Sequence, residues 1–288
     1  MALPSAPPAQ FNFAQFLIAA NNSRKEKTAL MDDIGTLSYG GMADQIRSCA
    51  AGLRKLGLKR EERVLLLMHD STDWVVSFLG ALYAGVVPVA VNTLLTPEDY
   101  AFMINNSRAQ AALVSSALLG TLTSAIAHGT KSIKHVVVSR HEGDLPPVHT
   151  HFKDLLASGA GPSLPAETHA DEPAFWLFSS GSTGNPKGTV HTQGNLYWTA
   201  QLYGKGVLGL SANDVVFSAA KLFFAYGLGN ALTFPLSVGA SVVLMAERPT
   251  PQATFKRLMD YKPTVFYGAP TGYGGMLASP DLPRKDQV

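Results

Sequence analysis

The sequence contains a single cysteine and lacks any long apolar run. Cys49 is the only cysteine among 288 residues, so an internal disulfide is excluded. The absence of a disulfide is compatible with a cytoplasmic protein. Because Cys49 lies among small residues on a predicted helix, we interpret it as a packing residue and not as a reactive thiol. No stretch reaches the roughly 18 apolar residues of a membrane helix. The first eight residues lack the basic start and apolar core of a signal peptide. We therefore expect a cytoplasmic chain without a membrane partner.

An excess of charge of either sign is missing too. Lys and Arg number 23 against 21 Asp and Glu, which leaves a formal charge of +2. This is too weak to predict binding to nucleic acid. Charged residues make up 15% and hydrophobic residues 46%, which favours a chain with much buried sheet. The length suggests about two domains at roughly 150 residues each. Nothing in the composition specifies an oligomeric state.

Apolar runs alternate with helical patterns along the chain. Continuous apolar runs at 63–68, 86–91, 111–114 and 135–139 predict buried strands, and amphipathic helices are predicted between them. Strands that are apolar throughout are typical of parallel sheets covered on both faces. The sequence therefore predicts an α/β fold with layered, mostly parallel sheets covered by helices.

A change in composition suggests where the chain divides. We expect a flexible tail at 1–10, a first α/β subdomain at 11–140, a loop-rich connection at 141–172 and a second α/β subdomain at 173–288. The connection is rich in Gly, Pro, Ser and His. Its histidines show no His-Glu-x-x-His spacing, and no Cys-x-x-Cys motif accompanies them, so no metal site is predicted.

The second subdomain opens on the most distinctive stretch. An apolar strand at 174–178 leads into Ser179-Ser180-Gly181-Ser182-Thr183-Gly184-Asn185-Pro186-Lys187-Gly188, and a second strand follows at 189–191. Its glycines let the backbone turn, and consecutive N–H groups can form a concavity for an anion. Hydroxyl groups and Lys187 add further donors and a positive charge. The stretch is suited to bind a polyphosphate.

The Walker A loop is the obvious alternative, and the spacing excludes it. Counted from Gly181, the second glycine of that motif falls on Pro186 and its hydroxyl falls on Gly188. The chain then continues as a strand and not as a helix. A P-loop kinase or GTPase is therefore excluded.

The stretch Ser-Ser-Gly-Ser-Thr-Gly-x-Pro-Lys-Gly resembles the signature of the acyl-adenylate-forming enzymes. Three further segments resemble the benzoate-CoA ligase branch of that superfamily: Arg60 to Met68, Phe223-Phe224-Ala225-Tyr226-Gly227-Leu228-Gly229-Asn230, and Tyr267-Gly268-Ala269-Pro270-Thr271-Gly272-Tyr273. The resemblance runs from about Phe11 to the last residue. It implies an acid-thiol ligase that adenylates an aromatic carboxylate with Mg-ATP and transfers the acyl group to CoA.

The resemblance also implies which residues bind the substrates. Those implied to bind ATP are Ser179, Ser180, Gly181, Ser182, Thr183, Gly184, Lys187 and His191. Those implied to bind the aromatic acid are Phe224, Ala225, Tyr226, Gly227, Gly268, Ala269 and Pro270. Tyr226 can stack on a flat ring, and Gly227 is expected to leave room beside the backbone for it. Lys221 is expected at a solvated end and is left out of the site.

Two departures from the family pattern limit these assignments. Close relatives have His-Thr-His after the loop, and this chain has His191-Thr192-Gln193. Glutamine cannot carry a proton, so an acid–base role is not available at residue 193. The adenylation lysine and the Mg²⁺-binding acid of the family belong to patterns that cannot be read here. Catalytic residues therefore stay unassigned, and we expect an N-terminal portion of a ligase.

Two other functions stay open. The chain by itself could be catalytically silent and retain at most weak binding of phosphate or aromatic acid. The parent protein could also be a ligase for another small carboxylate.

Overall fold

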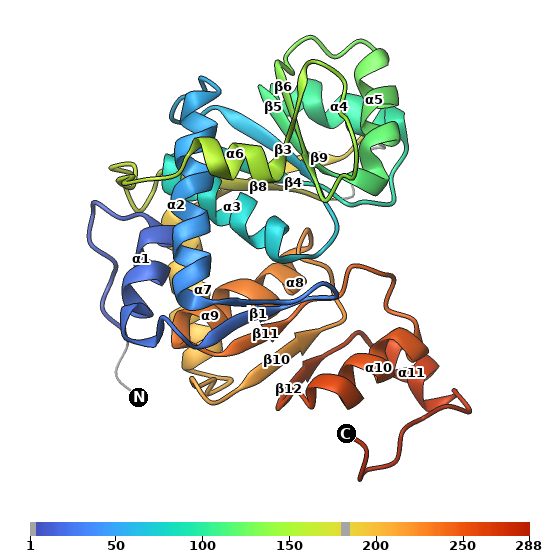
Figure 1. Cartoon of the computed structure of the whole chain (residues 1–288). Helices are drawn as coiled ribbons and strands as arrows, with labels where there is room; N and C mark the ends of the chain where they lie inside the picture. The colour runs from blue at the N-terminus through green and yellow to red at the C-terminus, as the bar shows by residue number, and fades with distance from the viewer. Residues whose placement is uncertain (1–3, 180–184) are drawn as a thin grey trace.

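A computed structural model describes residues 4–179 and 185–288, and the chain forms two sheets (Figure 1). The first sheet has seven strands in the order β7-β6-β5-β3-β4-β8-β9. They are β3 Arg63–Leu67, β4 Val87–Ala90, β5 Ala111–Ser115, β6 His135–Ser139, β7 His149–His151, β8 Pro173–Ser179 and β9 Lys187–Thr192. The second sheet has five strands in the order β12-β10-β11-β1-β2. They are β1 Thr28–Met31, β2 Thr36–Ser38, β10 Val215–Ser218, β11 Ser241–Val243 and β12 Val265–Tyr267.

Helices connect and cover the strands. The α-helices are α1 Phe13–Ala20, α2 Tyr39–Lys55, α3 Thr72–Ala84, α4 Pro97–Ser107, α5 Leu119–Ala127, α6 Phe152–Ser158, α7 Gln193–Thr199, α8 Ala225–Leu228, α9 Phe234–Val238, α10 Pro251–Tyr261 and α11 Pro270–Leu277. Short 3-10 turns lie at Asn22–Arg24 and Ser116–Leu118, and π-helical turns lie at Ala200–Lys205 and Gly229–Thr233. No helix within 4–179 and 185–288 has both the length and the apolar character needed to cross a membrane.

The predicted α/β architecture with mostly parallel sheets is confirmed. Every strand pair is parallel except β1 with β2 and β8 with β9. Strand β7 was not predicted, because its three residues, His149-Thr150-His151, have no apolar side chain to mark a strand. It lies at the edge of the first sheet beside β6.

In both sheets, strands that precede the predicted connection at 141–172 pair with strands that follow it. The strands β8 and β9 follow that connection but join the sheet built from β3 to β6. The strands β1 and β2 precede it but join β10 to β12. The predicted limits of the subdomains at 11–140 and 173–288 stay a prediction, and each sheet draws strands from both parts of the chain.

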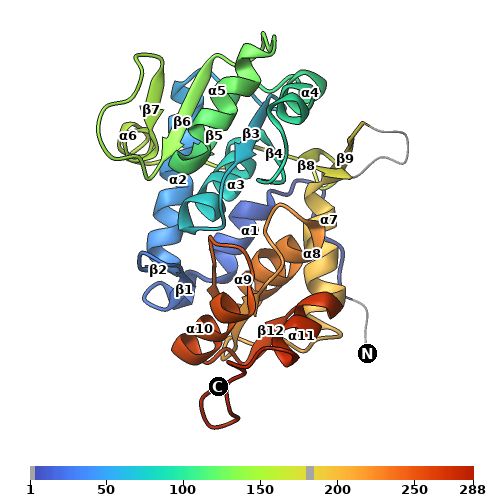
Figure 2. The same cartoon turned by 90° about the vertical axis from the view of Figure 1, so that its right-hand side faces the viewer.

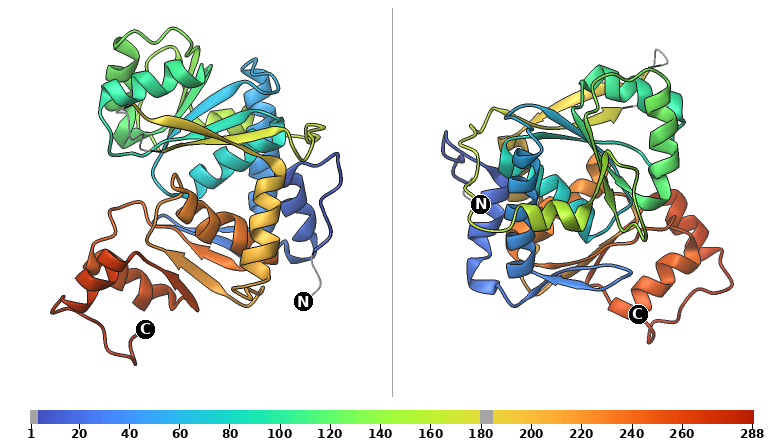
Figure 3. Two further views of the ribbon diagram at one scale, coloured as in Figure 1. Left: turned by 180° about the vertical axis from the view of Figure 1, so that it is seen from behind. Right: turned by 45° about the horizontal axis from the view of Figure 1, so that its top comes forward.

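The main core lies between the two sheets. Val64 and Leu66 on one face of β3 share a buried cluster with Leu30 of β1 and Val242 of β11, and α1, α2 and α3 contribute to the same cluster. The alternate β3 residue Leu65 faces a second cluster, to which α4 contributes. Since successive side chains of a strand point to opposite faces, β3 supplies both layers. Figure 3 shows α10 and α11, in red, at the outer end of the five-stranded sheet.

Helix ends follow the local chemistry of the sequence. The Ser71 hydroxyl caps α3 by accepting a hydrogen bond from Trp74 N, and Gly85 ends that helix in the left-handed conformation. Thr96 and Asp99 form a capping box at the start of α4, where Pro97 occupies the first turn. These caps satisfy backbone groups that the helix itself leaves unpaired.

Asp70 links the two sheets through a buried carboxylate. It follows β3, and both of its oxygens lie 3.2 Å from Leu222 N, which follows β10 of the other sheet. Burial raises the pKa of Asp70 to about 6, although Lys221 and the Leu222 N–H act in the opposite direction. The fold therefore holds a carboxyl group whose charged form is disfavoured.

The crossing of α2 and α3 depends on a glycine. A Cβ added at Gly80 of α3 would lie 2.7 Å from both Cβ and Sγ of Cys49. Cys49 is fully buried, and burial raises the pKa of its thiol to about 12, which supports its interpretation as a packing residue.

We expect Gly80→Ala to lower the free energy of unfolding by about 1–3 kcal/mol, because the added methyl group overpacks this crossing. Gly120→Ala is the matched control: Gly120 lies on α5, and nothing lies within 4 Å of its added Cβ. The control should raise stability by up to about 1 kcal/mol, since alanine favours helix over glycine. Urea unfolding measures the free energy of unfolding of both variants. An equal change in Gly80→Ala and Gly120→Ala would contradict the packing argument.

We expect Asp70→Asn to change how stability depends on pH. The pKa of Asp70 rises from its ordinary 3.8 to about 6 on folding, so the folded chain binds more protons than the unfolded chain between these values. This group therefore makes stability fall as pH rises through that window, by on the order of 2 kcal/mol. The asparagine variant should lack this fall. Urea unfolding of both proteins from about pH 4 to pH 7 tests it, and parallel profiles would contradict it.

Candidate functional site

A large cavity opens where strands of both sheets end. Its volume is about 1170 Å³. Most of its lining comes from segments that follow the carboxyl ends of five strands: His69 after β3, 92–94 after β4, 219–226 after β10, 246–249 after β11 and 268–276 after β12. Ligands of open α/β sheets bind at this edge, because loops there are free of the pairing that the strands require. The cavity is therefore the candidate substrate site.

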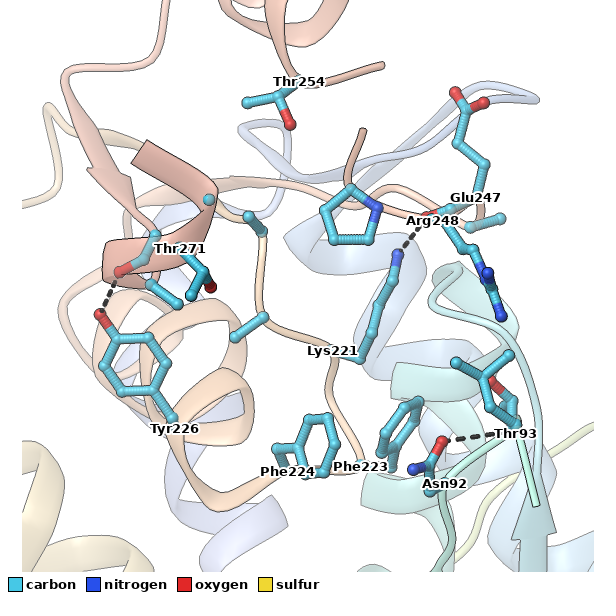
Figure 4. A pocket seen from close by; sticks show the side chains of 18 of the residues that line it. Asn92, Thr93, Lys221, Phe223, Phe224, Tyr226, Glu247, Arg248, Thr254 and Thr271 are labelled. Carbon is cyan, nitrogen blue, oxygen red and sulfur yellow. Dashed lines mark hydrogen bonds between the residues drawn. The ribbon is translucent and has the colours of Figure 1, made fainter. Parts of the chain in front are cut away.

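Aromatic side chains form much of its wall. Phe224 and Tyr226 are about half exposed, at 49% and 52%. Phe223 packs against Phe224 with ring centroids 4.6 Å apart, and Phe266 meets Tyr273 edge to face at 5.6 Å. Figure 4 shows Phe223, Phe224 and Tyr226 along one side of the cavity. Such a wall can hold a flat apolar ring by offset or edge contacts.

Lys221 brings a positive charge into this wall. Its Nζ donates hydrogen bonds to the carbonyl oxygens of Met245 and of Glu247, the second at 2.6 Å. Burial, the largest cause, lowers the pKa of Lys221, and the carboxylate of Asp70 acts to raise it. The expectation that Lys221 is a solvated end was wrong, because its ammonium group is partly buried and bound to two backbone carbonyls.

His69 lies beside this lysine. Burial first, and then the charge of Lys221, lower the pKa of His69 below its ordinary value. Arg248 and Glu247 complete the charged part of the lining. The lining thus combines aromatic rings with the cations Lys221 and Arg248, which suits a ligand with a flat ring and an anionic group.

Four of the seven predicted acid-binding residues line the cavity: Phe224, Tyr226, Gly268 and Ala269. The Tyr226 hydroxyl donates a hydrogen bond to Gly268 O at 3.4 Å, so two segments far apart in the sequence meet here. Ala225 and Pro270 lie next to lining residues but are not part of the lining.

Gly227 has a different role from the one expected. A Cβ at Gly227 would lie 2.0 Å from Lys221 O, so the space beside it is filled by the chain itself. The expectation that this glycine leaves room for a ring was wrong. Because Gly227 has no side chain, α8 can pack directly against the backbone of Ala220 and Lys221. This packing leaves Phe224 and Tyr226 in the cavity lining.

Three of the predicted ATP-binding residues can be placed. Ser180, Gly181, Ser182, Thr183 and Gly184 lie outside the described residues. Ser179 and Lys187 are exposed and oppose each other at the end of the β8–β9 hairpin, which Figure 2 shows above α7. His191 stacks on Phe175 with ring centroids 4.6 Å apart and planes at 8°, and burial lowers its pKa. None of these three lines the cavity.

The hairpin nevertheless ends at the same edge as the cavity. In the parallel pair of β4 and β8, Ala90 lies opposite Leu177. Two residues beyond this pair, β4 leads to Asn92 in the cavity lining, and β8 reaches Ser179. Ser179 is the first residue of the stretch 179–188 predicted to bind phosphate, called the phosphate stretch below. Parallel pairing therefore brings Ser179 and the lining residue Asn92 to neighbouring positions.

Gln193 is a structural residue. It is 1% exposed, and its Oε1 accepts a hydrogen bond from Phe13 N at 2.9 Å, at the first residue of α1. Its own N–H donates to Glu172 O. The side chain thus satisfies a backbone donor that α1 cannot, which agrees with the absence of an acid–base role at 193.

Several lining residues escaped the sequence analysis, among them His69, Asn92, Lys221, Arg248 and Tyr273. His69 and Asn92 directly follow the predicted strands at 63–68 and 86–91, so the position of strand ends was a usable signal. It was not sufficient, because the sequence does not say which strand ends face each other.

A Mg²⁺ site was expected to need an acid outside this chain. Within 4–179 and 185–288, no group of three or more His, Cys, Asp or Glu side chains is placed to hold a metal ion.

Comparison with known proteins identifies relatives. Residues 17–287 match the family described as AMP-binding enzyme. The chain is 47% identical over 284 residues to the benzoate–CoA ligase of Thauera aromatica, which covers 98% of this chain and 53% of that protein. It is 38% identical to the 4-hydroxybenzoate–CoA/benzoate–CoA ligase of Rhodopseudomonas palustris, with 95% and 50% covered.

Solved structures agree with these sequence matches. A benzoate CoA ligase from Burkholderia xenovorans is 51% identical with a TM-score of 0.89, covering 96% of this chain and 54% of that one. An anthranilate CoA ligase in complex with anthranoyl-AMP is 34% identical with a TM-score of 0.92, covering 96% and 53%. The chain spans about half the length of the curated relatives it matches. Since the family match extends over nearly all of its residues, the chain belongs to the AMP-binding enzyme family.

Proposed function

We propose that this chain is part of an ATP-dependent aryl-CoA ligase of the benzoate type. The observation that carries the proposal is the aromatic cavity at the carboxyl ends of the strands, with the phosphate stretch ending at the same sheet edge. The names of the relatives support the same substrate class, since they act on benzoate and hydroxybenzoate. ATP and CoA are the proposed co-substrates, and a cytoplasmic location is part of the proposal.

In the proposed reaction the substrate itself supplies the nucleophile. A carboxylate oxygen attacks the α-phosphorus of ATP, the bond to the leaving pyrophosphate breaks, and an acyl-adenylate forms. The thiolate of CoA then attacks the acyl carbon, and AMP leaves. No side-chain nucleophile is needed. The chain must hold the ring, orient the carboxylate toward the phosphate and stabilise charge on the leaving group.

Two of these tasks, holding the ring and stabilising the leaving group, have candidate groups. Phe224 and Tyr226 suit contact with the ring. Lys187 and the hydroxyl groups of 179–183 suit the β- and γ-phosphates, where positive charge and N–H donors counter the negative charge that develops. Ser180, Gly181, Ser182, Thr183 and Gly184 enter the proposal through their sequence pattern alone.

A second function is weighed against this one. The 288-residue chain alone could bind ligands without turning them over. Calorimetry with benzoate and with ATP tests binding, and an assay for benzoyl-CoA tests turnover. Multiple turnovers by this chain alone would exclude the silent alternative. Pyrophosphate release by the complete ligase that depends only on long-chain fatty acids would exclude the aromatic assignment.

We expect Tyr226→Ala to weaken benzoate binding about tenfold, because a stacking wall of the cavity is lost. Tyr226→Phe keeps the ring and removes only the long hydrogen bond to Gly268 O, so its affinity should stay within about threefold of the parent. Calorimetry measures both dissociation constants. Equal weakening in the two variants would show that the hydroxyl, and not the ring, carries the contact.

We expect Lys187→Ala to slow benzoate-dependent pyrophosphate release by the complete ligase about 100-fold, because a charge facing the leaving group is removed. Lys153→Ala is the control, since Lys153 is an exposed residue of α6. Thermal stability should be unchanged in both variants, as both side chains are exposed. An unchanged rate in Lys187→Ala would remove this residue from the proposed phosphate site.

A further inference from the structure

Two adjacent acids in the β1–β2 turn reach in different directions. Asp32 is 5% exposed, and its Oδ1 accepts hydrogen bonds from Ile34 N and Gly35 N at 2.9 and 3.1 Å, which close the turn. Its Oδ2 accepts from Thr72 N at 2.9 Å and pairs with Arg140. Thr72 begins α3 and Arg140 follows β6, so Asp32 ties the turn to the surroundings of the first sheet.

Asp33 ties the same turn to the cavity wall. Its Oδ2 accepts a hydrogen bond from Ala246 N at 3.3 Å, and its Oδ1 pairs with Arg257 of α10. Arg257 is 5% exposed and pairs through its other terminal nitrogen with Glu247. One buried guanidinium thus joins Asp33 to Glu247, and Ala246 and Glu247 both line the cavity.

The same wall segment is held from within the cavity by Lys221. Its Nζ donates to the carbonyl oxygens of Met245 and Glu247, and Figure 4 shows it pointing toward the segment that carries Glu247 and Arg248. Residues 245–247 are therefore fixed on both sides: by Lys221 on the cavity side and by Asp33 and Arg257 on the outer side. The β1–β2 turn lies more than 200 residues away in the sequence.

We propose that Asp33 and Arg257 are positioning residues for the substrate cavity: through Ala246 and Glu247 they set the place of the 246–249 wall. A guanidinium with two terminal nitrogens can hold two carboxylates in a fixed geometry, which a lysine cannot. Because Asp32 anchors the turn to α3, the wall is positioned relative to the first sheet, which supplies His69 and 92–94 to the same cavity. The expected change in benzoate affinity rests on the proposed function, whereas the expected change in the position of the 246–249 wall does not.

An ion pair that only stabilises the fold would behave differently. Lys256 and Asp260 form an exposed pair on the same helix α10, and neither lines the cavity. Loss of that pair should leave the wall in place. Loss of the Asp33–Arg257 connection should free the wall and change ligand affinity beyond any change in stability.

The test compares Asp33→Asn, Arg257→Lys and Glu247→Gln with the control Lys256→Ala in the 288-residue chain. Glu247→Gln is included because its side chain is 56% exposed, so this variant should fold even if loss of the buried arginine is harmful. Amide hydrogen exchange at Ala246 reports on the wall, thermal unfolding reports on stability, and calorimetry gives the dissociation constant for benzoate.

We expect at least tenfold faster exchange at Ala246 and about tenfold weaker benzoate binding in the three test variants, because a displaced wall no longer matches the ligand. The control Lys256→Ala should match the parent in its exchange rate at Ala246 and in its affinity for benzoate. Parent-like exchange at Ala246 in every test variant that folds would overturn the positioning role, as would unchanged benzoate affinity with a lowered unfolding temperature. If the parent fails to bind benzoate, the proposed function fails, and exchange at Ala246 alone then decides the positioning role.

Discussion

Burial of apolar surface between two parallel sheets is the constraint on which the rest of this structure depends. Val64 and Leu66 of β3 face Leu30 and Val242 of the other sheet across a core shared with α1, α2 and α3. Each sheet combines strands from early and late parts of the chain. Neither part of the chain can therefore complete a sheet without the other. Burying this apolar surface favours the layered arrangement and brings the strand ends of both sheets to one cavity.

The cavity follows from the direction of the strands. In a parallel sheet all carboxyl ends reach the same edge, and five such ends meet here. The residues at those ends need not pair with a neighbouring strand. They are therefore free to carry aromatic side chains such as Phe224 and Tyr226, and cations such as Lys221 and Arg248.

Charged groups hold segments of the cavity's walls in place. Asp70 links the ends of β3 and β10, and Lys221 holds the backbone of 245–247. Asp33 and Arg257 hold that segment from outside. Each of these groups loses hydration on folding and regains partners only in one geometry, so the network disfavours alternative positions of the wall.

The sequence by itself determined most of the helices and strands, the mostly parallel sheets and the family, because apolar periodicity, capping residues such as Ser71 and Thr96, and the Ser-Ser-Gly-Ser-Thr-Gly-x-Pro-Lys-Gly stretch are all local signals. Four of the residues that its resemblance to the family implied as acid-binding, Phe224, Tyr226, Gly268 and Ala269, line the cavity. Only the tertiary structure decided that Lys221 enters the cavity, that Gly227 makes room for the backbone and that Gln193 holds the start of α1. The physical reason is that these roles depend on which segments fold against each other. Such contacts, from Gly227 with Lys221 to Gln193 with Phe13, which lie 180 positions apart, leave no periodic pattern in the sequence.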